Sequence, residues 1–507
     1  MSPDAALLLG DVLPTGYYCA LRAEIGDGVP IFAKGANWIP TDSFVGAIPN
    51  DLYARLLVAA RDANMNMLRI WGGGLYEHDA FYNQCNALGI LIWQDFMFAC
   101  AAYPEHLADF AAEVEAEARY QVRRLRNHPA LALWCGNNEN QWLHDQRYWD
   151  QPDYDVPGSV YYHEVLPRVV AELDGAIPYW PGSPYGGNDY NSQTDGDRHN
   201  WNVWHGGFDR QFGEQPRGDQ GPEGVSYRRY AEDMGRFISE FGMHASPVLE
   251  TLRRSIPEDQ LYHHSPSMDH HNKDNPKNKG DNLMETVTGL PDTLEDYIDF
   301  SMIAQAEGLK FGIEHYRRRK PHCSGTLFWQ LNDCWPVLSW SVLDYYGFGK
   351  AGYFYSKRVY APVLASFKPL DDGGLELWIT NDLLQPVTDT VTVRLATFNG
   401  ETLLEDTLAK TNPLSELANY RQVLLSGDAT DSMAKAFFNT LTVTIPATII
   451  PIVIAAFAAY ALAWMDFAGR ALLIAAVVAL LVVLMALFAF WGGAKLEARF
   501  GGGEANS

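Results

Sequence analysis

The chain has 507 residues, 47% of them hydrophobic, which is enough to bury a large core and predicts more than one domain. Its 62 Asp and Glu outnumber its 38 Lys and Arg, and a formal net charge of −24 repels the phosphate backbone of nucleic acids. We therefore exclude nucleic acid as a partner.

Apolar runs of strand length alternate with stretches long enough for helices between residues 31 and 355. Helical spacing is clearest in residues 51–64 and 107–127, and the second segment has acidic residues early and basic residues late, as the helix dipole favours. The expected strands are residues 31–38, 65–71, 90–96, 130–136, 179–182, 202–205, 236–240 and 325–331. Strands in this alternation predict an α/β fold, a (β/α)₈ TIM barrel over residues 31–360.

Two of these apolar runs end abruptly in a carboxylate, at Glu139 and at Glu240. A buried parallel strand delivers the side chains at its carboxyl end to the rim of a barrel, where active sites lie. Hydrolysis of a glycosidic bond needs two facing carboxyl groups, one to protonate the leaving oxygen and one to attack or to activate water. Glu139 and Glu240 are therefore the candidate catalytic pair; a solvated cap or an ion-pair partner is the alternative for each.

The sequence pattern changes near residue 361 to alternating apolar and polar residues with turn residues between them. This pattern predicts the start of a β-sandwich over residues 361–430.

The last part of the chain is rich in apolar residues. Residues 436–465 and 471–491 contain no charged residue, and each run exceeds the roughly 20 residues that span a bilayer. We expect residues 431–507 to form a two-helix transmembrane segment that meets the lipid bilayer through residues 436–491. Lys435, Lys495 and Arg499 flank the pair, which favours cytoplasmic outer ends.

The cysteines and the first residues argue against export. The six cysteines form no CxxC pair, so we expect reduced thiols in a core rather than the framework of a small secreted protein. Residues 1–13 include a short apolar run without a preceding basic segment, so no secretory signal is expected. The expected location is membrane-associated with a cytoplasmic barrel, or cytoplasmic if the tail does not belong to the protein.

The histidine-rich residues 262–282 admit two interpretations. Their His and Asp residues suggest a metal site, whereas the Lys, Asn and Pro that follow indicate a mobile polar loop, which we favour. The sequence contains no glycine-rich phosphate loop and no convincing Ser-His-Asp triad. We expect no metal and no cofactor.

Six motifs, in one order, resemble the catalytic barrel of β-mannosidases in glycoside hydrolase family 2. They are KGANWIP (34–40), RIWGGG (69–74), WQDFMF (93–98), GNNEN (136–140), SEFG (239–242) and WQLNDCWP (329–336). The resemblance extends over about residues 16–368. It implies a retaining exo-β-mannosidase that removes terminal non-reducing β-D-mannose from a β-mannoside oligosaccharide by double displacement, with Glu139 as acid/base and Glu240 as nucleophile. The environments of the two glutamates should push their pKa values apart, so that Glu139 stays protonated and Glu240 ionised.

Further residues at the predicted strand ends are candidates for binding substrate. They are Asn138, Asp95, Trp71, Trp142, Trp204, His205, Trp329 and Arg69. Asn138 could donate a hydrogen bond to the sugar 2-hydroxyl, and Arg69 could hold Glu240 ionised. Asp95 either binds sugar hydroxyls or forms an ion pair, because a carboxylate that ends an apolar strand needs a partner. Each tryptophan is as compatible with a core as with a sugar platform.

Both ends of the chain depart from the family pattern. Family 2 β-mannosidases carry a sugar-binding β-sandwich and an immunoglobulin-like domain before the barrel, so residues 1–30 are interpreted as the remnant of a preceding β domain, and residues 361–430 as a partial immunoglobulin-like domain. Residues 437–487 resemble part of a sugar ABC-transporter permease, which suggests a fused or misjoined reading frame. The alternatives are a β-galactosidase or β-glucuronidase of the same family, a sugar-binding module without activity, and a permease fragment with an inactive barrel.

Overall fold

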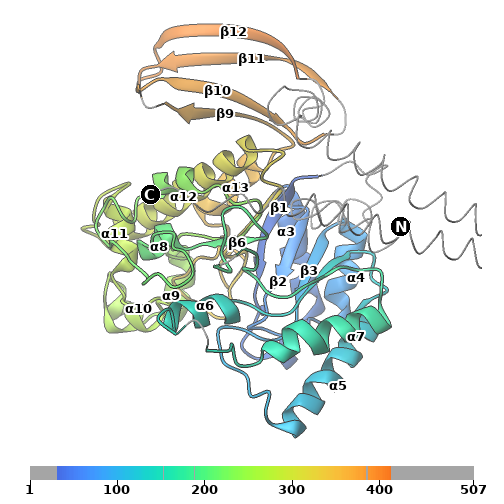
Figure 1. Cartoon of the computed structure of the whole chain (residues 1–507). Helices are drawn as coiled ribbons and strands as arrows, with labels where there is room; N and C mark the ends of the chain where they lie inside the picture. The colour runs from blue at the N-terminus through green and yellow to red at the C-terminus, as the bar shows by residue number, and fades with distance from the viewer. Residues whose placement is uncertain (1–30, 152–153, 188, 371, 384–385, 413–507) are drawn as a thin grey trace, which may run out of the picture. The chain divides into compact units, whose positions relative to one another are not determined.

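The computed structural model describes residues 31–151, 154–187, 189–370, 372–383 and 386–412 (Figure 1). The predicted N-terminal remnant, the predicted transmembrane segment and the permease-like segment lie outside the described residues. Among the described residues, the model contains no helix with both the length and the apolar character needed to cross a membrane.

Eight parallel strands form one sheet in the order β5-β4-β3-β2-β1-β8-β7-β6. Consecutive strands pair along the sheet except β5 and β6, which stand at its two ends. The first strand also pairs with the last, so that Gly35 of β1 aligns with Met67 of β2 on one side and Leu327 of β8 on the other. This is the strand order of a TIM-like α/β barrel. The strands are β1 (Ala33–Trp38), β2 (Met67–Ile70), β3 (Leu91–Asp95), β4 (Leu131–Cys135), β5 (Tyr179–Trp180), β6 (Arg198–Asn200), β7 (Ile238–Phe241) and β8 (Gly325–Phe328).

Helices and shorter helical turns follow the strands along the chain (Figure 1). The α-helices are α3 (Asn50–Asp62), α4 (Asp79–Leu88), α5 (Ala108–Leu125), α6 (Asn140–Arg147), α7 (Leu166–Leu173), α8 (Asn202–His205), α9 (Leu249–Ser255), α10 (Pro266–His270), α11 (Lys279–Glu285), α12 (Leu294–Arg318) and α13 (Ala351–Val359). The shorter turns are η1 (Val45–Ala47), η2 (Tyr161–Val165), η3 (Tyr227–Glu232) and η4 (Glu258–Gln260). The predicted helices over 51–64 and 107–127 correspond to α3 and α5.

The sixth strand is the main error of the sequence prediction. Residues 202–205, expected as a strand, form helix α8, and the strand lies just before it at β6. The residues of β6 are polar yet buried, because His199 contacts Glu139 inside the barrel while Arg198 and Asn200 contact Asp233, so the strand lacks an apolar signature. The apolar side chains of Val203 and Trp204, which suggested a strand, pack into the core from a helical turn instead.

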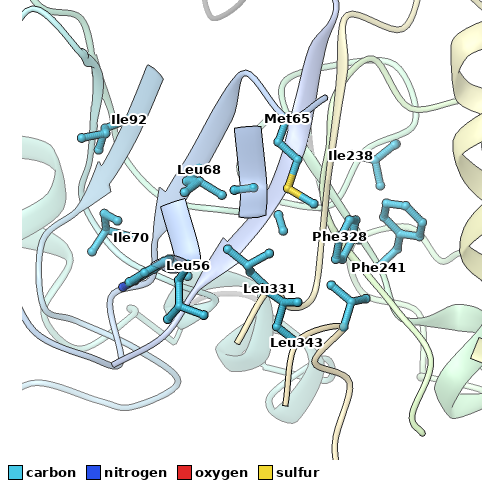
Figure 2. Packing of buried hydrophobic residues seen from close by; sticks show 14 of the residues in the cluster. Leu56, Met65, Leu68, Ile70, Ile92, Ile238, Phe241, Phe328, Leu331 and Leu343 are labelled. Atoms are coloured by element: carbon cyan, nitrogen blue, oxygen red, sulfur yellow. The ribbon is translucent and has the colours of Figure 1, made fainter. Parts of the chain in front are cut away.

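Side chains alternate between the two faces of each barrel strand, as the period of two requires. In β2, Leu68 and Ile70 join the large cluster between the strands and the helices, where Figure 2 shows them with Ile92, Ile238 and Phe328. Met67, the neighbour of Leu68, faces the barrel interior with a second cluster. The same alternation turns the side chain of Arg69 toward the interior.

The residues predicted to open a β-sandwich form two antiparallel strand pairs. One pair consists of β9 (Val363–Pro369) and β10 (Leu375–Asn381), and the other of β11 (Val387–Ala396) and β12 (Thr402–Asn412).

Asp382, directly after β10, joins the first of these pairs to the barrel through three cations. Its carboxylate lies 3.0 Å from Lys34 Nζ, 2.7 Å from Arg317 Nη2 and 2.7 Å from Lys320 Nζ, and only 7% of the side chain is exposed. Burial by itself would raise the pKa of Asp382, but the three cations lower it to about 2. A single carboxylate therefore neutralises part of a buried positive cluster.

We expect Asp382→Asn to lower the free energy of unfolding at pH 7 by about 2–3 kcal/mol, since each unit of pKa depression corresponds to about 1.4 kcal/mol. A depressed carboxyl pKa stabilises the fold above the unfolded value of 3.8, and this contribution disappears as the pH falls toward about 2. Urea denaturation between pH 2 and 7 measures both effects. Asp389→Asn, at an exposed position of β11, is the control; equal stabilities of the two variants would contradict the assigned role.

Candidate active site

A buried guanidinium organises the carboxyl end of the barrel. Arg69 is 0% exposed, and its Nη1 donates to Glu240 Oε1 at 2.6 Å. Its Nη2 donates to Asp95 Oδ2 at 2.8 Å and to Asn138 Oδ1 at 2.7 Å. Burial alone would lower the pKa of Arg69, but Asp95 and Glu240 raise it, so the cation is retained. One side chain of β2 therefore positions three sequence-predicted site residues from β3, β7 and the end of β4.

Both carboxylate oxygens of Asp95 accept hydrogen bonds from other groups of the protein. Besides Arg69, Oδ1 accepts from Trp93 Nε1 at 2.9 Å, and Oδ2 accepts from the Gly72 backbone N–H at 3.0 Å. The residue is 0% exposed. Of the two roles left open by the sequence, the structure contains the ion pair, and Asp95 presents no surface to a ligand.

Glu139 stands at the sharp turn between β4 and α6. Its φ of 64° lies in the left-handed region, which is uncommon for a residue other than glycine and typical of strained functional positions. Oε1 lies 2.8 Å from His199 Nδ1, and Oε2 accepts a weak hydrogen bond from Cys100 Sγ at 3.4 Å. The side chain is 12% exposed, so a ligand can reach it.

Glu240 lies in β7 and is 3% exposed. Its Oε1 is held by Arg69, and its Oε2 accepts from Trp201 Nε1 at 3.2 Å. His199 Nδ1 lies 3.5 Å from the same Oε2. One oxygen of Glu139, one oxygen of Glu240 and one nitrogen of His199 all lie within 4.8 Å of one another. The structure thus brings the two predicted carboxylates together.

These three residues offer the ligand atoms of a metal site. However, the guanidinium of Arg69 already lies 2.6 Å from Glu240, and its charge opposes a second cation at the same carboxylate. The arrangement is better suited to moving a proton between carboxyl groups than to holding a metal.

His199 and Trp201 were missed by the sequence analysis because the sixth strand was placed too late. In the structure His199 of β6 pairs in register with Glu240 of β7, so the two side chains face the same interior. His199 Nε2 lies 2.9 Å from Ser183 Oγ, which donates to Asp197 Oδ2 at 2.7 Å. The signal that could have found His199 is its position in a polar strand beside Glu240, which only the correct register reveals.

The pKa values of the two glutamates are pushed apart, but in the opposite order to the expected one. Burial raises the pKa of Glu240 to about 7, against the opposing charges of His199 and Arg69. Burial also disfavours ionised Glu139, but the hydrogen bond and the charge of His199 outweigh it and lower the pKa of Glu139. His199 Nδ1 lies 2.8 Å from Glu139 Oε1, within hydrogen-bond distance.

The aromatic candidates separate into two groups. Trp71 and Trp329 are half-buried and meet edge to face at 5.0 Å, and half-buried Trp142 lies 6.3 Å from the ring of His199, so all three retain accessible surface. Trp204 is 1% exposed and stacks on His244, which leaves no face for a sugar. His205 is exposed, and its Nδ1 lies 2.7 Å from Lys279 Nζ. Among the residues that the structure describes, neither Trp204 nor His205 contacts Glu139 or Glu240 directly.

The chain is similar to known β-mannosidases. The family described as Mannosidase Ig/CBM-like domain matches residues 373–436. Beta-mannosidase B of Emericella nidulans is 34% identical over 415 aligned residues, which cover 76% of this chain and 47% of the relative. Beta-mannosidase B of Aspergillus niger is 35% identical over 418 residues, with the same coverage. The chain therefore spans about half the length of the curated relatives it matches.

Solved structures support the same fold. The crystal structure of beta-D-mannosidase from Dictyoglomus thermophilum has a TM-score of 0.67 and 42% sequence identity, and the match covers 76% of this chain and 46% of that one. An exo-chitosanase of Amycolatopsis orientalis has a TM-score of 0.57 at 16% identity over 76% of this chain and 44% of its own, and shows a similar fold only.

Removal of the central cation tests this description of the site. We expect Arg69→Met to lower the free energy of unfolding by roughly 3–5 kcal/mol, since it leaves the buried carboxylates Asp95 and Glu240 without their counter-charge. Adding Asp95→Asn should recover part of the loss. The control is Arg55→Met, because Arg55 forms an exposed ion pair with Asp51 at 3.8 Å, of a kind worth about 0–1 kcal/mol. Equal losses for Arg69→Met and Arg55→Met, measured by urea denaturation, would show that the site does not depend on the charge of Arg69.

Proposed function

We propose that this chain is a retaining exo-β-mannosidase that hydrolyses terminal non-reducing β-D-mannose residues of β-mannosides. The observation that carries the proposal is the close approach of Glu139 and Glu240, whose nearest carboxylate oxygens lie within 4.8 Å. Retaining glycosidases hold their two carboxyl groups about 5–5.5 Å apart, whereas inverting enzymes leave about 6.5–9.5 Å for a water molecule. The approach found here favours direct attack by one carboxylate.

In the first step, a carboxylate oxygen of Glu240 attacks the anomeric carbon as the bond to the leaving oxygen breaks. Glu139 donates a proton to that oxygen, so the leaving group departs as a neutral alcohol and the sugar stays on Glu240 as an ester. Arg69 at 2.6 Å favours the ionised form of Glu240 that attacks. It acts against the burial of that carboxyl, which favours the protonated form.

In the second step, Glu139 acts as a base. It takes a proton from a water molecule that attacks the anomeric carbon, the ester bond to Glu240 breaks, and mannose leaves with its original anomeric configuration. Both steps use one proton at Glu139, and His199 Nδ1 lies 2.8 Å from Glu139 Oε1. We assign His199 the role of a positioning residue that shares this proton, supported by Ser183 and Asp197 behind it.

Two kinds of contact could select the sugar. Asn138 is held by Arg69 at 2.7 Å through its side-chain oxygen, and its amide nitrogen donates one hydrogen to Cys100 Sγ at 3.4 Å, which leaves the second hydrogen for the 2-hydroxyl. Trp71, Trp142 and Trp329 have accessible surface for stacking on a sugar ring. The preference for a mannoside over a galactoside or glucuronide rests on the similarity to proteins named as β-mannosidases.

Attachment to a lipid bilayer through residues 436–491 is a separate proposal. It rests on the uncharged length of that segment alone, which lies outside the described residues.

Substitution of the two glutamates separates their roles. Glu240→Gln removes the nucleophile and should lower kcat/KM on an aryl β-mannoside on the order of 10⁴-fold or more. Glu139→Ala should lower the rate on natural β-mannosides by roughly 10²–10⁴-fold but spare aryl mannosides whose leaving group needs no proton, and azide should restore turnover. Glu250→Gln, at an exposed position, serves as control. Full activity of Glu139→Ala on a natural β-mannoside would refute the assignment.

The pH profile tests the environment of Glu240. Because only ionised Glu240 attacks and burial raises its pKa from 4.5 to about 7, kcat/KM on an activated aryl mannoside, whose leaving group needs no proton from Glu139, should rise with pH through a limb near 7. The same limb should persist in Glu139→Ala on an activated aryl mannoside, since it belongs to Glu240. Initial rates between pH 4 and 9 measure it, and a limb near 4.5 would mean that Arg69 overcomes the effect of burial.

A further inference from the structure

A second cluster of titratable side chains lies in the segment between α9 and α12, which the sequence analysis favoured as a mobile polar loop. The segment contains η4, α10 and α11 rather than an irregular loop. His263 and His264 precede α10, and Asp281 lies in the first turn of α11. Their side chains meet on one carboxylate: His263 Nε2 lies 2.9 Å from Asp281 Oδ1, and His264 Nε2 lies 2.8 Å from Asp281 Oδ2.

The two imidazoles are held in place from behind. His264 Nδ1 lies 2.9 Å from Asp269 Oδ1, so the nitrogen that faces away from Asp281 already has a carboxylate partner. The ring of His263 stacks on the ring of Tyr297 with centroids 3.9 Å apart and an angle of 23°, and Tyr297 is buried in α12. Both Nε2 atoms therefore point toward Asp281. Because the two imidazoles are already held in place, they would lose little conformational entropy when they bind a ligand.

The backbone is also strained at His264. His264 has a φ of 60°, in the left-handed region that residues other than glycine seldom adopt. Such strain persists where surrounding contacts impose it, and it is concentrated at binding and catalytic positions. An ordinary surface ion pair between a histidine and an aspartate does not need this conformation.

The donor set matches a transition metal. One ligand atom from each of His263, His264 and Asp281 lies within 4.8 Å of the other two. Zinc binds imidazole nitrogen at about 2.0–2.1 Å and carboxylate oxygen at about 2.0–2.2 Å, so an ion between these atoms needs only a small adjustment. Imidazole ligands favour zinc and its neighbours over magnesium and calcium, which prefer oxygen alone.

We propose that His263, His264 and Asp281 bind one divalent transition metal ion of the zinc class, with Asp269 orienting His264. Histidine ligands characteristically donate their second ring nitrogen to a carboxylate, which fixes the tautomer and increases the basicity of the ligating nitrogen. The side chains of His263, His264 and Asp281 are 20%, 35% and 18% exposed, so water can complete the coordination and the ion can exchange.

The site would connect the residues directly before α10 with helix α11. Lys279 of α11 contacts His205, and His271, directly after α10, lies against the backbone oxygen of Pro336 in the motif that begins at Trp329. An ion bound there would stabilise the packing of α10 and α11. It would take no part in hydrolysis, since Glu139 and Glu240 are not among its ligands. The expected role is structural.

Zinc titration of the chelator-treated full chain, monitored by calorimetry and by thermal unfolding, tests the proposal. We expect one ion per chain bound by this cluster with a Kd of about 1 μM or lower. His263→Ala and Asp281→Ala should weaken this binding at least 100-fold, and Asp269→Asn by roughly 10–100-fold, as losses of ligands and of their orienting partners do. His270→Ala, an exposed histidine of α10 outside the cluster, should bind as the unaltered chain does.

A measurement on the unaltered chain removes the dependence on how the variants fold. Cobalt(II) bound by two imidazoles and a carboxylate should produce visible d–d absorption that zinc abolishes, and zinc should raise the Tm. Unchanged affinity in both His263→Ala and Asp281→Ala would overturn the proposal, as would the absence of both the cobalt absorption and the thermal shift.

Discussion

The site depends on one buried cation, Arg69. Removing a guanidinium from water costs several kcal/mol unless carboxylates compensate it, and here Asp95 and Glu240 do so from neighbouring parts of the barrel rim. Their geometry in turn positions Asn138, which shares the same amino group of Arg69 with Asp95. Neither carboxylate can move without leaving a buried charge unpaired, so the site is organised before a substrate arrives.

This organisation follows from the alternation of side chains along β2. Because Leu68 and Ile70 pack outward under the helices, Arg69 must point into the barrel. His199 reaches the same interior from β6, in register with Glu240. Its Nδ1 lies 2.8 Å from Glu139 and 3.5 Å from Glu240, so one ring nitrogen contacts both carboxyl groups. The barrel strands hold these side chains in place, and Arg69 and His199 contact the two glutamates.

The sequence allowed prediction of those candidate site residues that lie in or beside apolar runs. Glu139, Glu240 and Asp95 became candidates because each ends an apolar run, and Arg69 because it begins the motif RIWGGG. Polar strand β6 could not be placed, since Arg198 and His199 are buried against Asp233 and Glu139, partners distant in sequence, rather than by their own hydrophobicity. The expected order of the two glutamate pKa values was wrong because it depends on the burial of Glu240 and on the contact between Glu139 and His199. The burial of Trp204 likewise follows from tertiary packing that no local pattern encodes.

The most direct test of the mechanism is to trap the covalent intermediate. A 2-deoxy-2-fluoro-β-D-mannosyl fluoride reacts without a proton from Glu139, and its fluorine at carbon 2 slows hydrolysis of the ester, so one sugar should accumulate on the chain. Mass spectrometry of the digested protein should find it on the peptide that contains Glu240, with no label in Glu240→Gln. A label on any other carboxylate, or turnover of the reagent with inversion of configuration and no adduct, would contradict the assignment of Glu240 as the nucleophile.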